Sequence, residues 1–432
     1  MSDFNFGNRL YELRTKCKMS QSELGKLVGV SNKAVSKWEM GNAKPGIEIL
    51  NKLSLIFNVP LETLINGENN VPNIHKIVIT GGPCAGKSTA LSWIQNEFSE
   101  KGYFVIFISE AATELFNAGA SYGVYKNSFD FQTTLMSLQI EKEKIYYDAA
   151  KKMKNNKVLI VCDRGSLDSK AYVSNLEFQQ LLHELGTNEI ELRDNYDAVF
   201  HLVSAAKGAS EYYTLANNAA RRESVEEAIA LDDLIISAWT GHPHLRIIDN
   251  STDFEGKMKN LISEISSFLG EPEPFEIERK YLIKYPDIKK LESLPNCEKI
   301  EIIQTYLISD NDDEVRIRQR GKGGNYIYYK TIKKKISNIK RVEIEKRLSK
   351  EEYLELLMKA DPNYRQIRKT RYCLTYEKLY YEIDVFPFWD DKAIMEIELE
   401  NEYEKVSLPP FIEVVKEVTD DENYKNSSIA KI

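Results

Sequence analysis

The spacing of hydrophobic residues changes twice along the chain. Up to residue 67 they recur every three or four positions, which indicates helices. Short apolar runs then alternate with long helical stretches, and beyond residue 273 many segments alternate between polar and apolar positions, as strands do. Clusters of Asn, Gly and Pro at 66–73 and 270–275 separate these regions. The pattern predicts three domains, at 1–67, 75–269 and 273–432.

Composition and charge narrow the class of protein. The chain has 432 residues, 42% of them hydrophobic and 29% charged, which is typical of globular domains. Its net charge of −8 disfavours a surface that binds nucleic acid throughout, so any DNA contact must be local. We expect a cytoplasmic protein, because no apolar run approaches the roughly 20 residues of a membrane span and the first residues lack a signal-peptide pattern. The five cysteines form no close pair and are expected to be reduced thiols.

The first region predicts an all-α bundle with a helix-turn-helix. Ser20 or Ser22 can cap a helix, Gly29 can supply the turn that ends it, and Ser31 can cap the next helix. Two further apolar stretches, at 47–57 and 61–65, would complete the bundle. The region carries nine basic and six acidic residues, a net charge of +3. This charge attracts phosphate weakly unless two copies bind together, so a homodimer would suit double-stranded DNA.

The second of these helices has one polar face. Val35 and Trp38 would be buried, and the opposite face would suit a major groove. The run QSELGKLVGVSNKAVSKWEMGNAKP resembles the phage-repressor-like (XRE-type) helix-turn-helix family. The resemblance implies that Gln21 meets a phosphate and that base edges are approached by Asn32, Lys33, Ser36 and Lys37. A helical protein-interaction domain without DNA contact is the alternative.

The second region opens with a phosphate-binding motif. A buried strand, KIVIT, runs directly into G-x-x-x-x-G-K-S, and a helical stretch follows. Backbone N–H groups of such a loop surround phosphate oxygens, while Lys87 would reach the β and γ phosphates and Ser88 would hold magnesium. The predicted nucleotide-binding residues are Gly81, Gly82, Pro83, Cys84, Ala85, Gly86, Lys87, Ser88 and Thr89.

Carboxylates follow the next two strands of this region. One strand ends at Glu110 and another ends at Asp163 and Arg164, at the sheet edge where ligands of α/β folds bind. Asp163 is the preferred catalytic carboxylate, because it can hold magnesium or accept a proton from an attacking hydroxyl; a simple helix cap is the alternative. Arg221 and Arg222 follow a polar loop and could deliver positive charge from a lid, although most paired arginines are solvated surface.

The strand, phosphate loop, D-R-G sequence and double arginine together resemble the small-molecule kinase branch of the P-loop superfamily, including ribosylnicotinamide-kinase-like AAA ATPases. The resemblance implies an α/β domain with a parallel sheet that binds ATP or GTP with Mg²⁺. It also implies that Glu110 shares or replaces the role of base assigned to Asp163.

The third region contains about eight candidate strands whose charged residues share one face. The run FEIERKYLI begins with E-x-E-x-K, and arginines alternate in EVRIRQR. Eight strands are enough to close a barrel, but opposite charges inside it would be unstable without a charged ligand and metal ions. An outward-facing charged sheet is the alternative.

These spacings resemble the CYTH family of triphosphate tunnel metalloenzymes, an α+β fold built on an antiparallel eight-stranded tunnel. The resemblance implies that phosphates are bound by Lys280, Arg316, Arg318, Lys330, Arg341 and Arg371. It implies that Mg²⁺ or Mn²⁺ is bound by Glu276, Glu278, Asp384, Glu396 and Glu398.

Together these regions predict a DNA-binding, nucleotide-binding protein of small-molecule kinase type, fused to a metal-dependent tunnel that binds or hydrolyses a nucleoside triphosphate or polyphosphate. Two alternatives stay open. The chain could be a transcriptional regulator that senses a phosphorylated ligand without turnover, or its tunnel could be an adenylyl cyclase.

Overall fold

The computed structural model describes residues 2–17, 19–57, 59, 61, 64, 72–155, 157–208, 224–270, 278–309, 314–335, 341–399 and 406–432. The chain divides into two compact units. The smaller unit consists of residues 1–74 and 148–158, and the larger of residues 75–147 and 159–432. Both predicted breaks, at 66–73 and 270–275, fall mostly outside the described residues.

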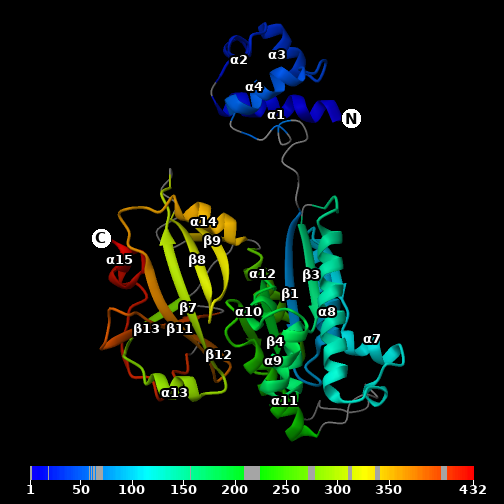
Figure 1. Ribbon diagram of the computed structural model, residues 1–432, viewed down its shortest axis with the longest axis vertical. Coiled ribbons are helices and arrows are strands. Elements are labelled where there is room, and N and C mark those ends of the chain that lie inside the picture. Colours follow the sequence, from blue (N-terminus) through cyan, green and yellow to red (C-terminus); the bar gives the residue numbers. More distant parts are fainter. Residues whose placement is uncertain are drawn as a thin grey trace. The chain divides into compact units, whose positions relative to one another are not determined.

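The smaller unit contains the predicted helix-turn-helix (Figure 1). Its helices are α1 (Ser2–Lys16), α2 (Gln21–Val28), α3 (Asn32–Glu39) and α4 (Ile47–Phe57). Ser20, not Ser22, caps α2, and the side chain of Glu23 completes a capping box with the backbone of Ser20. Gly29 ends the helix with a φ of 84°, and Ser31 caps α3, as predicted. Val35 and Trp38 are buried in the core of the bundle.

The larger unit begins with a five-stranded parallel sheet in the order β2-β3-β1-β4-β5. Its strands are β1 (Asn73–Thr80), β2 (Phe104–Ile108), β3 (Lys157–Asp163), β4 (Ala198–Leu202) and β5 (Leu245–Ile248). Nearly every side chain of β3 and β4 is buried, which explains why the sequence shows continuous apolar runs here.

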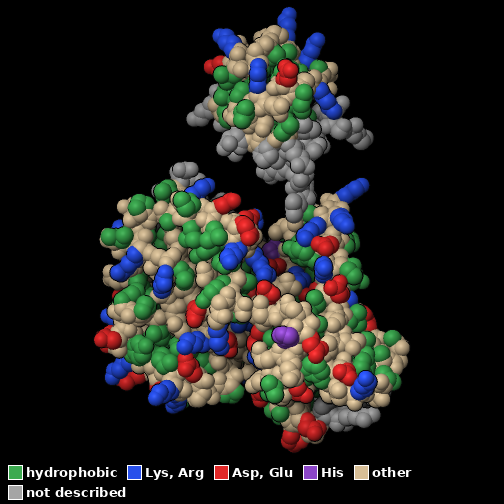
Figure 2. All heavy atoms as spheres, in the orientation of Figure 1, with side chains coloured by type: hydrophobic (Ala, Val, Ile, Leu, Met, Phe, Trp, Pro, Cys, Tyr) green, Lys and Arg blue, Asp and Glu red, His purple; other side chains and the backbone are tan. Residues whose placement is uncertain are grey.

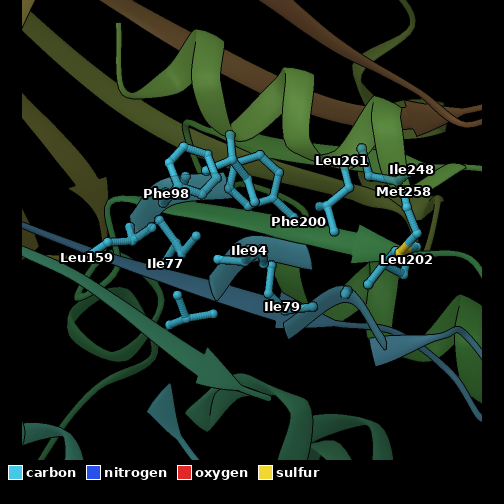
Figure 3. Close-up of a cluster of buried hydrophobic side chains, with 14 of the residues drawn as sticks. Ile77, Ile79, Ile94, Phe98, Leu159, Phe200, Leu202, Ile248, Met258 and Leu261 are labelled. Atoms are coloured by element: carbon cyan, nitrogen blue, oxygen red, sulfur yellow. The ribbon is translucent and has the colours of Figure 1, made fainter. Parts of the chain in front are cut away.

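Helices surround this sheet, and Figure 1 shows the longest of them, α8, running alongside β3. They are α6 (Lys87–Glu100), α7 (Ala111–Asn117), α8 (Ser128–Ala150), α9 (Asn175–Glu184), α10 (Glu189–Arg193), α11 (Val225–Trp239) and α12 (Phe254–Phe268), with 3-10 turns at Tyr122–Val124 and Ser166–Tyr172. Side chains of β1, β4, α6 and α12, among them Ile79, Ile94, Phe200 and Leu261, pack into one apolar core (Figure 3). This core fixes the loop between β1 and α6.

The rest of the larger unit is built on an antiparallel sheet in the order β10-β9-β8-β7-β11-β12-β13-β6-β14. Its strands are β6 (Glu278–Lys284), β7 (Cys297–Tyr306), β8 (Glu314–Lys322), β9 (Asn325–Lys335), β10 (Arg341–Leu348), β11 (Ile367–Tyr376), β12 (Leu379–Val385), β13 (Lys392–Glu398) and β14 (Val414–Glu417). The described part of the sheet therefore has nine strands, one more than predicted. The additional strand, β14, is four residues long and joins β6 through an irregular register, so it leaves no alternating pattern in the sequence.

Short helices accompany this sheet: α13 (Ile288–Ser293), α14 (Lys350–Leu357) and α15 (Asn426–Ala430), with a 3-10 turn at Glu422–Tyr424.

A buried cluster of ion pairs connects the antiparallel sheet to the α/β part of the same unit. Asp194 pairs with Arg193 at 2.7 Å and with Arg320 of β8 at 3.3 Å. Arg347 donates a hydrogen bond to the backbone oxygen of Asp194 at 2.9 Å.

Within the described residues, no helix has the length and apolarity needed to cross a bilayer.

Candidate phosphate-binding sites

The loop between β1 and α6 has backbone angles that only glycine adopts easily at two positions. Gly81 has a φ of 143° and Gly86 has a φ of 91°. A side chain at Gly81 would meet the backbone oxygen of Leu202 at 2.1 Å, and one at Gly86 would meet the ring of Phe254 at 2.7 Å. Cys84 also has a positive φ, of 55°. The loop therefore turns tightly over the start of α6, as the motif predicts.

Lys87, the first residue of α6, folds back over the loop. Its ammonium group donates hydrogen bonds to the backbone oxygens of Gly81 and Gly82, at 3.0 and 3.1 Å. Burial, with help from the nearby Arg164, lowers the pKa of Lys87 to about 8. The side chains of Ser88 and Thr89 are exposed beside it. The lysine is therefore held where an incoming anion would meet it.

Asp163, at the end of β3, retains an unused oxygen. Its Oδ1 atom is buried and, within the described part of the chain, has no hydrogen-bond partner. Burial raises the pKa of Asp163, the neighbouring Glu110 and Asp168 add to that rise, and Lys87 and Arg164 oppose it. A buried carboxylate oxygen without a donor has the oxygen chemistry that Mg²⁺ prefers, as does the exposed hydroxyl of Ser88 at the start of α6. The residues present therefore fit a magnesium ion.

Arg164 connects the other carboxylates at this edge. It has a φ of 69°, and its Nε donates to Glu110 at 2.6 Å while Nη1 lies 3.3 Å from Asp168. Burial tends to raise the pKa of Glu110, but Arg164 and the hydroxyl of Thr113 lower it overall. Glu110 is thus an ion-paired carboxylate, whereas Asp163 is the one with an unoccupied oxygen.

Asp232 of α11 belongs to no motif that the sequence shows. Its side chain is fully buried and accepts hydrogen bonds from the backbone N–H groups of Gly82 at 2.9 Å and Ser204 at 3.1 Å. It also contacts His201 at 3.0 Å and Lys207 at 2.9 Å. Burial opposes its ionised form, but His201 and Lys207 lower its pKa overall. The Gly82 amide, predicted to bind nucleotide, is therefore used to fix the loop to α11.

The predicted tunnel residues of β6, β11, β12 and β13 form one network of ion pairs. Lys280 lies 2.8 Å from Glu396, and Arg371 binds Asp384 through two contacts of 2.7 Å. Arg371 also lies 3.1 Å from Glu396. Lys280 and Glu396 are opposed in the strand register, as are Arg371 and Asp384. Lys280 and Arg371 oppose burial and lower the pKa of Glu396.

Two further members of this network were missed by the sequence analysis. Lys369 is buried and pairs with Asp384, and Glu382 pairs with Arg371. Burial lowers the pKa of Lys369 and raises that of Glu382. Both lie two residues from predicted members, on the same faces of β11 and β12, so the period of two could have found them.

The remaining predicted phosphate ligands lie on neighbouring strands. Arg316 is buried beside Tyr306. Arg318 pairs with Glu345, and its Nε is buried without a hydrogen-bond partner among the described residues. Lys330 is half-buried on β9. Glu276, Arg221 and Arg222 lie outside the described residues, as does the side chain of Arg341.

One cavity of about 80 Å³ lies beside β5, β12 and β13. Its lining includes five glutamates, namely Glu264, Glu278, Glu382, Glu396 and Glu398. Carboxylate oxygens are suitable ligands for Mg²⁺ or Mn²⁺, so the donor set fits a hard divalent cation. In the described residues, however, no three such side chains already surround one point, and each of the five glutamates pairs with a lysine or arginine. We call this space the acidic cavity.

The helix-turn-helix presents a polar surface on α3. Asn32, Lys33 and Lys37 are exposed and Ser36 is partly exposed. Lysine and arginine side chains project from this unit in Figure 2. Gln21, expected at a phosphate, donates a hydrogen bond to Glu39 at 2.7 Å.

Three families match the chain in succession. A helix-turn-helix family matches residues 10–64, an AAA domain family matches residues 76–257, and a CYTH domain family matches residues 274–425. The chain combines a helix-turn-helix, an AAA domain and a CYTH domain, in that order. This order is the one predicted from the motifs.

Curated relatives match short parts of the chain. The HTH-type transcriptional activator BcrR of Enterococcus faecalis is 38% identical over 63 residues, which are 15% of this chain and 31% of the relative. Repressor protein C2 of Salmonella phage P22 is 38% identical over 68 residues, or 16% and 32%. The chain thus spans about a third of the length of these relatives.

Solved structures align with parts of the chain. The inorganic triphosphatase NE1496 is 27% identical and covers 36% of this chain and 94% of its own, with a TM-score of 0.25. The P22 c2 repressor in complex with a synthetic operator is 40% identical and covers 15% of this chain and 96% of its own, with a TM-score of 0.14.

Proposed function

We propose that this protein binds ATP or GTP in its AAA domain, as small-molecule kinases do, and binds or hydrolyses a triphosphate in its CYTH domain. The helix-turn-helix would bring both activities to double-stranded DNA, as a monomer or as a homodimer. The observation that carries the proposal is that each sheet gathers charged residues far apart in sequence at one anion site. In the AAA domain, Asp163 and Lys87 lie close enough to influence each other's pKa, and in the CYTH domain Lys280, Arg371 and Glu396 form ion pairs.

In the AAA domain, an anion that enters the loop would replace the carbonyls of Gly81 and Gly82 as the hydrogen-bond acceptor of the Lys87 ammonium group. Asp163 would use its unoccupied oxygen toward magnesium or toward the proton of an attacking hydroxyl. Arg164 is already held by Glu110 and Asp168, so its positive charge has a fixed position near the phosphates. Arg221 and Arg222 stay predicted lid residues.

In the CYTH domain, a triphosphate would replace carboxylates as the partner of Lys280, Arg318 and Arg371. The Nε of Arg318, which has no hydrogen-bond partner in the described part of the chain, supports this, because a buried donor without an acceptor is costly. A bound Mg²⁺ or Mn²⁺ would polarise a phosphoryl oxygen and neutralise charge on the leaving group. We propose that the glutamates of the acidic cavity would hold such an ion, because carboxylate oxygens suit a hard divalent cation.

The decisive experiment measures phosphate release by the full chain from ATP, GTP and tripolyphosphate with Mg²⁺ or Mn²⁺. We expect turnover of at least one substrate. Loss of nucleotide turnover in Lys87→Ala and of tripolyphosphate turnover in Lys280→Ala would assign the two sites. Binding without turnover would instead support the sensor, and cyclic AMP formed from ATP would support the cyclase. Failure to bind or hydrolyse any of these compounds would refute the proposal.

The proposed DNA function needs a separate test, because it depends on the α3 surface alone. Lys33→Ala and Lys37→Ala each remove one exposed positive charge. We expect each to weaken binding to duplex DNA in a gel-shift assay and to relax the preference for one base sequence, because both lysines are predicted to approach base edges. Lys26→Ala, at an exposed site on α2, is a matched control.

A further inference from the structure

The acidic cavity is lined by residues of both the AAA domain and the CYTH domain. The AAA domain contributes residues 245–248 of β5 and Glu264 of α12, and the CYTH domain contributes strands β12 and β13 and the start of β6. β5 is an edge strand of the parallel sheet, and β12 contacts it. An edge strand has unpaired backbone groups that proteins usually cover, and here the CYTH domain lies against it.

Arg246 is the cation that β5 places in this cavity. Its guanidinium pairs with Glu398 of the CYTH domain and lies 3.3 Å from Glu264 of its own domain. A second ion pair crosses nearby, between Lys378 of the CYTH domain and Asp249 of the AAA domain, at 3.0 Å. The AAA domain therefore supplies a positive charge to a carboxylate that the CYTH resemblance assigns to metal.

The other CYTH glutamates of the cavity pair with cations of the CYTH domain. Glu396 is held by Lys280 and Arg371, Glu382 is held by Arg371, and Glu278 lies 3.5 Å from Lys280. The side chains of Lys280 and Arg371 are nearly buried, whereas that of Arg246 is 27% exposed. Among the cations paired with cavity glutamates, Arg246 is therefore the one most open to exchange with a cation from solvent.

We propose that Arg246 is an internal counter-ion of the acidic cavity, which a divalent cation must displace from Glu398 before it can bind there. The inference rests on the proposed metal site of the CYTH domain. It makes Arg246 a positioning residue, because it would set the affinity for the cation without touching the reacting phosphates. Occupancy of the cavity would then break one ion pair between the two domains.

The test is a titration of the full chain with Mn²⁺, in which electron paramagnetic resonance measures free ion. Every variant carries Asp163→Asn, which removes the carboxylate proposed for metal in the AAA domain. Arg246→Gln should tighten Mn²⁺ binding about tenfold, because one competing charge a few ångströms away is lost. Arg246→Lys keeps that charge and should stay within about twofold of the parent. Arg368→Gln, at an exposed site on β11, should have no effect.

The gain from Arg246→Gln should shrink as salt is raised, because the pair is partly exposed. Equal affinities of Arg246→Gln and the parent, with binding abolished by Glu398→Gln, would overturn this inference while leaving the metal site intact. If neither Glu398→Gln nor Glu396→Gln changes Mn²⁺ binding, the proposed metal site itself is wrong and the inference fails with it. Thermal melts of each variant would show whether the domains remain folded.

Discussion

The two candidate anion sites of this protein differ in what forms them: backbone in the AAA domain and charged side chains in the CYTH domain. The AAA loop relies on backbone geometry, with positive φ angles at Gly81 and Gly86 and a single lysine folded over the loop. The CYTH site relies on side chains, because Lys280, Arg371 and their carboxylates neutralise one another across adjacent strands. A backbone site costs little to keep empty, whereas a site of buried charges is stable only while every charge has a partner. The two should therefore respond differently to mutation.

The largest expected effect is on stability, in the CYTH domain. Arg371→Met leaves Asp384, Glu382 and Glu396 without their shared cation in a buried setting. Removing one partner of a buried pair typically costs about 3–5 kcal/mol, so the free energy of unfolding should fall by that amount. Chemical denaturation of the full chain measures it.

Arg368→Met is the matched control for that experiment, since Arg368 lies on the same strand with an exposed side chain. It should change the free energy of unfolding by less than about 0.5 kcal/mol. Equal losses of unfolding free energy in Arg371→Met and Arg368→Met would show that the buried ion pairs add no stability beyond that of an exposed arginine. The expected difference between the AAA and CYTH sites would then be wrong.

The next effect is on binding, in the AAA domain. Lys87→Ala should lower affinity for a fluorescent ATP analogue or the rate of its turnover by about 10²–10³-fold, the usual loss for a charged group aimed at phosphates. The fold should be retained, because Lys87 bonds only to loop carbonyls among the described contacts. Lys101→Ala, at the end of the same helix, is the control. A large loss of stability with intact binding would contradict the backbone description of this site.

A smaller effect is expected at Asp232. Asp232→Asn removes a buried charge that accepts from the Gly82 amide and contacts His201 and Lys207. We expect the binding free energy of ATP and the free energy of unfolding to weaken together, each by about 1–3 kcal/mol. The reason is that the Asp232 carboxylate both fixes the loop at Gly82 and satisfies buried donors of the fold. Fluorescent nucleotide binding and denaturation measure the two losses. Asp233→Asn, at a neighbouring exposed carboxylate, should leave ATP affinity unchanged.

The smallest effect is a pH dependence of the AAA site. The pKa of Lys87 is lowered to about 8, so its positive charge is present below pH 8 and lost above it. ATP affinity should therefore fall as pH rises, by about tenfold, or about 1.4 kcal/mol, between pH 7 and 9. Stability changes in the opposite sense. Between pH 8 and the ordinary lysine pKa the unfolded chain binds more protons, so this group favours folding increasingly as pH rises.

Nucleotide titrations from pH 6.5 to 9.5 test this dependence. Lys87→Ala should bind weakly at every pH and lose the change near pH 8. The same profile in Lys87→Ala as in the parent would assign the titration to another group.

Local features of both sites could be predicted from the sequence. The loop at 81–88 follows from glycine spacing between a strand and a helix, and a period of two placed Lys280, Arg371, Asp384 and Glu396 on one face. The same period of two gives Arg316, Arg318 and Arg320 equivalent positions on one strand face. It could not show that Arg320 forms an ion pair with Asp194 of the AAA domain. Nothing near Gly82 in the sequence indicates Asp232, which lies 150 residues further along.

The sequence by itself determined the three domains, their order, the phosphate loop, the Ser31 cap and the charged faces of the strands. These features depend on neighbours within a few residues, where chain geometry fixes which side chains share a face. Only the tertiary structure decided which charges became partners, including Asp232 with Gly82 and Arg246 with Glu398. Those contacts require distant segments to meet after folding, and the spacing within one segment carries no information about the segment that packs against it.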